Sequence, residues 1–152
     1  DKLIAAGNNV TAMNITDKVD LAEFDKIIIG GSIRHGKHSA AVYDFIEANQ
    51  TVLEQKPSSF FSVSLVARKP LKNTADTNPY MRAFFEKSPW KPQLAEVFGG
   101  NLNYPSYGSM DRNIIRFIMW ITKGPTAADT NIEYTDWNKV DTYAESVNQL
   151  VV

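Results

Sequence analysis

The chain has 152 residues, of which 43% are hydrophobic and 22% are charged, and its formal net charge is −1. This length fits one domain, and this share of apolar residues can form a core, which excludes a disordered chain. The near-zero charge gives no reason to expect nucleic acid as a partner. The absence of cysteine excludes disulfides, cysteine-ligated metals and thiol nucleophiles.

The first half of the chain predicts strands that alternate with helices. The run KIIIG at 26–30 is apolar on both faces, which is typical of a central strand in a parallel sheet. Gly7 suits the cap of a helix end, and Ser39 suits the start of a helix. The expected elements are a helix end at 1–6, a strand at 10–15, a short helical turn at 21–24, a strand at 26–30, a loop at 32–38 and a helix at 39–49.

The second half continues the alternation. Pro79 favours the first turn of a helix, Gly124 and Pro125 stop another, and Asp136 favours the start of the last one. The expected elements are a strand at 59–65, a polar loop at 66–78, a helix at 79–87, a strand at 94–98, a loop at 101–109, a helix at 111–123, an irregular segment at 126–134 and a helix at 136–150. This order predicts one α/β domain, residues 1–152, with a doubly wound parallel sheet and helices on both faces.

Three loops follow predicted strands at the edge where an open parallel sheet binds ligands. The first, residues 31–39, carries Gly31 and Gly36, a hydroxyl and several basic side chains. Glycine lets backbone N–H groups approach a ligand closely. An ordinary strand-to-helix turn with a solvated basic face explains the same composition, so both interpretations stay open.

The second and third loops combine apolar groups with polar ones. Arg68, Lys69 and Lys72 stand beside apolar residues, which suits a flat and partly anionic ligand. A long exposed loop whose charges give solubility is the alternative. The third loop, residues 100–109, has tyrosines that can stack on a ring system or simply cover the sheet edge.

Two histidines, His35 and His38, lie three residues apart on the first loop. No acidic cluster stands near them, so we expect no zinc site and no other metal. Either imidazole could serve as a proton donor or as a polar loop residue, and we favour the second role for His38. No catalytic triad is readable.

Five stretches occur in order along the chain: GGSIRHGKHS at 30–39, SSFFSVSLVARKP at 58–70, NPYMRAFFEKSPWKP at 78–92, GG-x-L-x-YP-x-Y at 99–107 and YTDW at 134–137. Together they resemble the flavodoxin-like, quinone-dependent protoporphyrinogen oxidases of bacterial haem biosynthesis. The combination SVSLVARKP is much more specific than a single glycine-rich turn. The resemblance implies a flavodoxin-like fold with an extra helical insertion at about 109–125.

The resemblance also implies an activity. Such an enzyme is an oxidoreductase acting on CH–CH groups: with FMN as cofactor it oxidises protoporphyrinogen IX to protoporphyrin IX and passes electrons to a membrane quinone. Carried over by position, the residues expected at the flavin are Ser32, Ile33, Arg34, His35, Gly36, Ser62, Val63, Ser64, Leu65, Val66, Ala67, Gly100, Asn101, Leu102, Asn103 and Tyr104.

The porphyrinogen substrate carries two propionates, for which cationic side chains are the natural partners. We expect Arg68, Lys69 and Lys72 to serve, together with Arg34, because an arginine fork pairs with a carboxylate through two hydrogen bonds. His35 is the one nearby candidate for the proton acceptor in catalysis.

The helix expected at 111–123 carries Arg112, Arg116 and Lys123 roughly on one stripe. One hypothesis is a membrane-surface helix, which would make the protein cytoplasmic and peripheral on the inner membrane. The other is a core-packed helix whose basic residues face water.

Flavodoxin-like chains begin with a strand and a phosphate-binding loop. Residues 1–7 match the helix that follows that loop, so we expect this first strand to be absent, its place lying between 10–15 and 26–30. We therefore expect a chain that starts at Asp1 to bind FMN weakly or not at all. Two other functions stay open: a flavodoxin-type electron carrier or general FMN-dependent quinone reductase, and a non-catalytic flavodoxin-like module.

Overall fold

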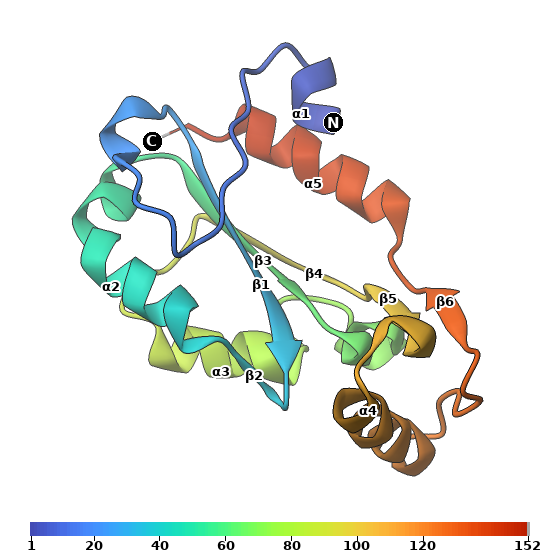
Figure 1. The fold of residues 1–152 in the computed structure, drawn as a ribbon. Helices are drawn as coiled ribbons and strands as arrows, with labels where there is room; N and C mark the ends of the chain where they lie inside the picture. The colour runs from blue at the N-terminus through green and yellow to red at the C-terminus, as the bar shows by residue number, and fades with distance from the viewer. Residues whose placement is uncertain (152) are drawn as a thin grey trace.

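The structure is a computed structural model that describes residues 1–151. Its main helices and strands alternate along the chain, as Figure 1 shows. The helices are α1 (Lys2–Ala5), α2 (Ala40–Gln55), α3 (Pro79–Lys87), α4 (Ser109–Ile121) and α5 (Trp137–Gln149). The strands are β1 (Ile27–Arg34), β2 (Lys37–His38), β3 (Ser58–Val63), β4 (Leu94–Phe98), β5 (Asn101–Asn103) and β6 (Asn131–Glu133).

The central sheet has the strand order β2-β1-β3-β4. β1 runs parallel to β3, which runs parallel to β4, so all three strands end at the same edge. β2 pairs antiparallel with only the last two residues of β1. The short strands β5 and β6 form a separate antiparallel pair. This arrangement confirms the predicted α/β fold with a parallel sheet.

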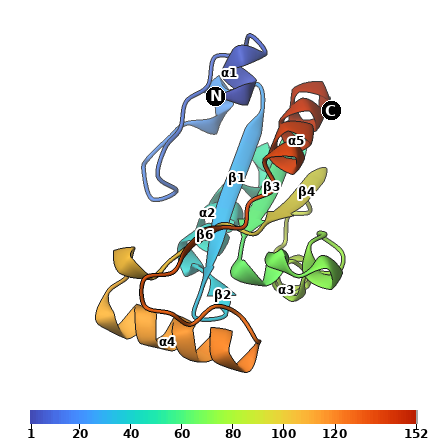
Figure 2. The same cartoon turned by 90° about the vertical axis from the view of Figure 1, so that its right-hand side faces the viewer.

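Helices cover both faces of the sheet, as Figure 2 shows. On one face α2 and α3 bury their apolar residues against the strands, and the ring of Phe60 stacks on that of Phe84 with centroids 4.0 Å apart. On the other face α5 packs Tyr143 and Val147 against Phe98. Burying a large apolar side chain in this way contributes about 2 kcal/mol to stability. The sheet is therefore a rigid platform for the loops at its edge.

Two local expectations are wrong. Residues 10–15 form no strand, because no neighbouring strand pairs with them, and Val10 and Met13 are exposed. A cavity of about 310 Å³ separates this segment from β1. Residues 32–38 are not an open loop: β1 continues to Arg34, turns at His35-Gly36 and returns as β2.

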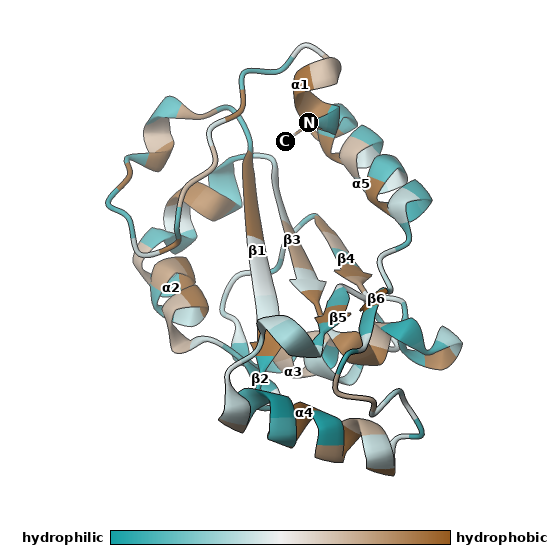
Figure 3. Cartoon of the chain, turned by 45° about the vertical axis from the view of Figure 1, so that its right-hand side comes forward, coloured by the Kyte–Doolittle hydropathy of each residue, from teal (hydrophilic) through white to brown (hydrophobic). Residues whose placement is uncertain are grey.

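The remaining differences concern element bounds: α2 continues to Gln55, past the expected end at 49, and β5 lies within the expected loop at 101–109. α4 begins at Ser109, two residues before the expected start, and the segment expected to be irregular at 126–134 contains β6. The strands are brown along part of their length in Figure 3, whereas α4 alternates between hydrophilic and hydrophobic turns. Within residues 1–151, we find no helix with the length and apolar character needed to span a bilayer.

Candidate functional site

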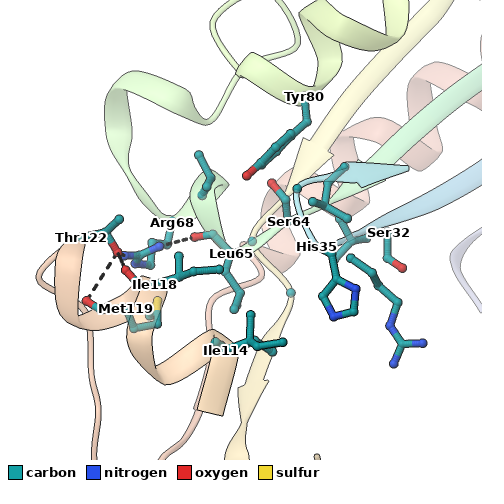
Figure 4. A pocket seen from close by; sticks show the side chains of 18 of the residues that line it. Ser32, His35, Ser64, Leu65, Arg68, Tyr80, Ile114, Ile118, Met119 and Thr122 are labelled. Atoms are coloured by element: carbon teal, nitrogen blue, oxygen red, sulfur yellow. Dashed lines mark hydrogen bonds between the residues drawn. The ribbon is translucent and has the colours of Figure 1, made fainter. Parts of the chain in front are cut away.

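A cavity of about 310 Å³ opens at the carboxyl edge of the sheet, between the strand ends and α4. Figure 4 shows Leu65 and Ile118 near its centre, Arg68 on one side, His35 on the other, and Tyr80 reaching in from α3. Its lining residues come from all three loops expected at this edge, and from α4. The cavity therefore has two walls of different origin, a strand-end wall and a helical wall.

The first part of the strand-end wall is the hairpin between β1 and β2. His35 and Gly36 form its two-residue turn, and both have positive φ, at 49° and 79°. Such a turn matches the twist of the paired strands, and glycine or asparagine fits it best. His35 occupies a conformation that L side chains rarely adopt, and its ring lies at the cavity.

The second part comes from the ends of β3 and β4. Ser64 follows β3 directly, is 5% exposed, and its backbone N–H donates to the carbonyl of Phe98 at 2.9 Å. Among the side chains of residues 1–151, its Oγ is the one buried polar atom without a hydrogen-bond partner. Gly100 has φ +70°, and a Cβ there would lie 2.7 Å from Cγ1 of Val63. The backbone can approach a ligand closely here because no side chain intervenes.

The helical wall is built by one face of α4. Ile114, Ile115, Ile118 and Met119 line the cavity, and Met119 is almost fully buried. Arg68 ties this helix to the loop after β3, donating to the carbonyl of Leu65 at 2.8 Å and to Oγ1 of Thr122 at 3.1 Å. The wall is thus apolar, with a guanidinium at one end.

The other end of α4 contacts the hairpin. Asp111 lies in the first turn, with Oδ1 3.2 Å from Nε2 of His35 and Oδ2 3.9 Å from Nη2 of Arg34. All three side chains line the cavity. Side-chain contacts therefore join the two walls at both ends of the helix.

Comparison with known proteins identifies this architecture. A family model described as a flavodoxin domain matches residues 1–129. This chain belongs to the flavodoxin domain family. No solved structure matches the chain significantly.

Two relatives share much of the sequence of this flavodoxin domain. A Leishmania major protein named protoporphyrinogen IX dehydrogenase (quinone) is 48% identical over 124 residues, which are 82% of this chain and 54% of that protein. An Escherichia coli K12 protein of the same name is 41% identical over 127 residues, which are 84% of this chain and 70% of that protein. The chain thus spans about half the length of the Leishmania protein.

Most residues expected at the flavin line this cavity of the flavodoxin domain. They are Ser32, Ile33, Arg34, His35, Gly36, Val63, Ser64, Leu65, Val66, Gly100 and Asn101. The four side chains expected to bind substrate, Arg34, Arg68, Lys69 and Lys72, line it as well. The structure therefore brings most of the first set and all of the second set to one cavity.

Five expected residues do not line the cavity, because they are engaged elsewhere. Ala67 packs in the core beside α2 and α3, and Leu102 packs below α4. Tyr104 is buried, and its hydroxyl donates to the carbonyl of Pro125 at 2.6 Å. The backbone N–H of Asn103 donates to the hydroxyl of Tyr107 at 3.2 Å.

The fifth residue, Ser62, pairs with His38 behind the wall. Its Oγ lies 2.7 Å from Nε2 of His38, and both side chains are buried. Burial lowers the pKa of His38 to about 4, so this imidazole is neutral at physiological pH. The plain polar role favoured for His38 agrees with this buried position. Alternation along β3 puts Ser62 on the same face as Phe60, but it puts Ser64 there as well, so this signal does not separate the two serines. What differs is that Ser62 lies within the strand, whereas Ser64 follows its last residue.

Several lining residues are not among those expected from the sequence, chiefly Tyr80, Asp111 and the isoleucines of α4, whereas Tyr107 belongs to the tyrosines expected at this edge. The spacing of Asp111, Ile115 and Met119 by four residues indicates one helical face. That spacing does not say what the face contacts, because the position of α4 depends on its packing against distant loops.

Proposed function

We propose that this protein binds FMN with low affinity in the cavity and oxidises protoporphyrinogen IX to protoporphyrin IX, with a membrane quinone as electron acceptor. One observation carries the proposal. The strand ends of a flavodoxin domain form a cavity with an unpaired buried hydroxyl and a cationic rim, in a chain 48% and 41% identical to two proteins named protoporphyrinogen IX dehydrogenase (quinone).

The residues of the strand-end wall fit a flavin ring. The Oγ of Ser64 lacks a partner, and a buried hydroxyl of this kind is stabilised by a ligand that hydrogen-bonds to it. Gly100 leaves its backbone accessible at φ +70°. A flat ring with polar edges matches this combination of a hydroxyl and exposed backbone.

The helical wall fits the substrate. Ile114, Ile115 and Ile118 offer apolar contacts to a tetrapyrrole. Lys69 and Lys72 stand at the rim of the same cavity, where their ammonium groups can pair with the propionates. Arg68 is already bonded to Leu65 and Thr122, so its main contribution is to hold α4 in place.

A bound flavin would supply the hydride acceptor, which the side chains of the protein cannot provide. Each two-electron oxidation would remove a hydride from a bridging carbon of the porphyrinogen and a proton from a pyrrole nitrogen, and a final shift of a proton from a bridging carbon to a nitrogen would give the porphyrin. The pyrrole N–H bond breaks and an N–H bond forms on the proton acceptor, for which we assign His35. The hydride electrons leave the protein with the quinone.

The outward face of α4 suits a membrane surface. Met110, Phe117, Trp120 and Ile121 lie on this face with exposed fractions of 76%, 60%, 68% and 59%. Exposed aromatic and aliphatic side chains in this number favour an interfacial helix. We propose that this face brings the protein to the cytoplasmic side of the membrane that holds the quinone.

Anaerobic turnover tests the activity. The protein, saturated with FMN, is expected to convert protoporphyrinogen IX to the fluorescent porphyrin when a quinone is added, and to stop when the quinone is omitted. Quinone reduction by a nicotinamide donor without porphyrinogen oxidation would instead identify a general quinone reductase.

Vesicle flotation tests the membrane contact. We expect binding to anionic vesicles and a loss of about tenfold in affinity for the double variant F117S/I121S. Its matched control replaces Val10 and Met13, exposed apolar residues away from α4, by serine. Equal binding by both variants would reject α4 as the membrane contact.

A further inference from the structure

We propose that Asp111 is a positioning residue for His35, which holds the imidazole in the tautomer whose Nδ1 can accept a proton from the substrate. This inference rests on the proposed function and deepens it, since it gives α4 a part in the chemistry. The tautomer of His35 can also be measured in the protein alone, without flavin or substrate.

The contact between the two side chains fixes the direction of the hydrogen bond. Oδ1 of Asp111 lies 3.2 Å from Nε2 of His35. An ionised carboxylate can only accept, so Nε2 must be the donor. A neutral imidazole has one N–H, which leaves the lone pair of Nδ1 free. The carboxylate therefore selects the tautomer.

Arg34 approaches the other oxygen of the carboxylate. Its Nη2 lies 3.9 Å from Oδ2 of Asp111, so the two oxygens face different partners of the hairpin. Oδ1 thus faces His35, while Oδ2 has only the screened attraction of an exposed guanidinium. The exposed fractions of Arg34, His35 and Asp111 are 81%, 61% and 39%, so the cluster adds little to stability.

The backbone at the turn points to the same role. His35 has φ 49°, and within residues 1–151 the one other non-glycine residue with positive φ is Lys123, which follows the C-cap residue Thr122 of α4. A strained conformation that persists at the edge of a cavity is a recognised sign of function. Here the strain places the ring of His35 between the cavity and the first turn of α4.

The contact also couples the proton acceptor to the substrate wall. Asp111 belongs to the same helix as Ile114 and Ile118, which we assign to the porphyrinogen. Because this carboxylate is part of α4, His35 is oriented only while the helix lies against the hairpin. The imidazole of His35 is therefore oriented for proton transfer only when the apolar wall of α4 is in place.

Nitrogen-15 NMR of the imidazoles in flavin-free protein tests the pair directly. At alkaline pH the wild type is expected to show His35 as the Nε2–H tautomer, with the signal assigned through the His35→Asn variant. Asp111→Asn should give a mixture of tautomers, because an amide can both donate and accept, and Asp111→Glu should restore the wild-type pattern. Asp129→Asn, an exposed carboxylate outside the cavity, is the matched control. An Nδ1–H tautomer in the wild type, or no change in Asp111→Asn, would overturn the proposal.

Kinetics test whether the orientation matters for catalysis. Asp111→Asn should lower kcat about tenfold and change KM for the porphyrinogen less than about twofold, the effect expected for a misplaced acid–base group. In the His35→Asn background the same substitution should cause no further loss, because Asp111 acts through His35. An equal loss in both backgrounds would contradict the positioning role. Absence of turnover in the wild type would count against the proposed function, while the tautomer measurement would still decide the pairing.

Discussion

The two walls of the cavity differ in how they are held. The strand-end wall belongs to a parallel sheet whose faces are covered by α2, α3 and α5, and its backbone is fixed by strand pairing. The helical wall is one helix, joined to the hairpin through Asp111 and to the loop after β3 through Arg68. A rigid wall suits a cofactor that stays in place, and a wall held by a few side chains suits substrates that exchange.

The two histidines of the hairpin also differ in how firmly they are held, although they are close in sequence. His38 is buried behind the strand-end wall with Ser62, whereas His35 is exposed between the walls. Their spacing in sequence is three residues, yet one is neutral through burial and the other is available to solvent and ligand. The packing of the hairpin against the sheet buries His38, which has a structural role, and leaves His35 exposed, where it can take part in a reaction.

Protonation of His38 gives the largest expected effect on the strand-end wall. Its folded-state pKa of about 4 lies below the ordinary value of 6.5, so the unfolded chain binds more protons between these two pH values. His38 should therefore not change the free energy of unfolding near neutral pH. As the pH drops from 6.5 to about 4, the free energy of unfolding should fall by up to about 3 kcal/mol.

Urea unfolding at a series of pH values measures this effect. The His38→Gln variant should lose most of the additional acid sensitivity between pH 6.5 and 4. The same slope in wild type and variant would show that His38 does not carry it. His35→Asn serves as the control on the exposed side of the hairpin.

Gly100→Ala should damage the strand-end wall next most strongly. The new Cβ would lie 2.7 Å from Val63 at φ +70°, which costs about 1–3 kcal/mol and displaces the backbone at the cavity. We expect FMN affinity to fall at least about tenfold. In the control Gly108→Ala the added Cβ has no atom within 4 Å, so both stability and affinity should be nearly unchanged.

Substitution of two buried serines, Ser59 on β3 and Ser64 just beyond its end, should distinguish a residue that stabilises the fold from one that binds FMN. Ser64→Ala removes an unpaired hydroxyl, so flavin-free protein should gain about 1 kcal/mol while FMN affinity falls several-fold. Ser59→Ala breaks the 2.8 Å hydrogen bond to Tyr143 on α5, so stability should fall by about 1–2 kcal/mol. FMN affinity should stay unchanged in that second variant. Calorimetric unfolding and flavin titration measure both quantities, and equal behaviour of the two serines would refute the assignment of Ser64.

The sequence predicted the strand-end wall well. The apolar run at 26–30, the glycines that follow it and the loop after β3 are local signals, and eleven of the sixteen residues expected at the flavin line the cavity. Strand order and the common edge follow from the alternation of elements. Ser62 does not line the cavity because it lies within β3 and pairs with His38, a contact that depends on how the hairpin packs on the sheet.

The helical wall was harder to predict. A helix at 111–123 was expected, but its contact with the hairpin depends on the packing of residues far apart in sequence, such as Arg68 with Thr122. The hairpin carries no clear signal in the sequence, because a turn with positive φ at two residues is typically Asn-Gly and here it is His35-Gly36. Residues 10–15 alternate as a strand does, but alternation alone does not reveal whether a partner strand exists, and none pairs with them.

A crystal structure of the protein with FMN at saturating concentration tests the central claim most directly. We predict that the flavin ring lies in the cavity between the walls, within hydrogen-bond distance of Oγ of Ser64 and against the backbone of Gly100, with the face toward Ile118 open for substrate. A flavin ring bound elsewhere, for example in the cavity between residues 10–15 and β1, would contradict the account.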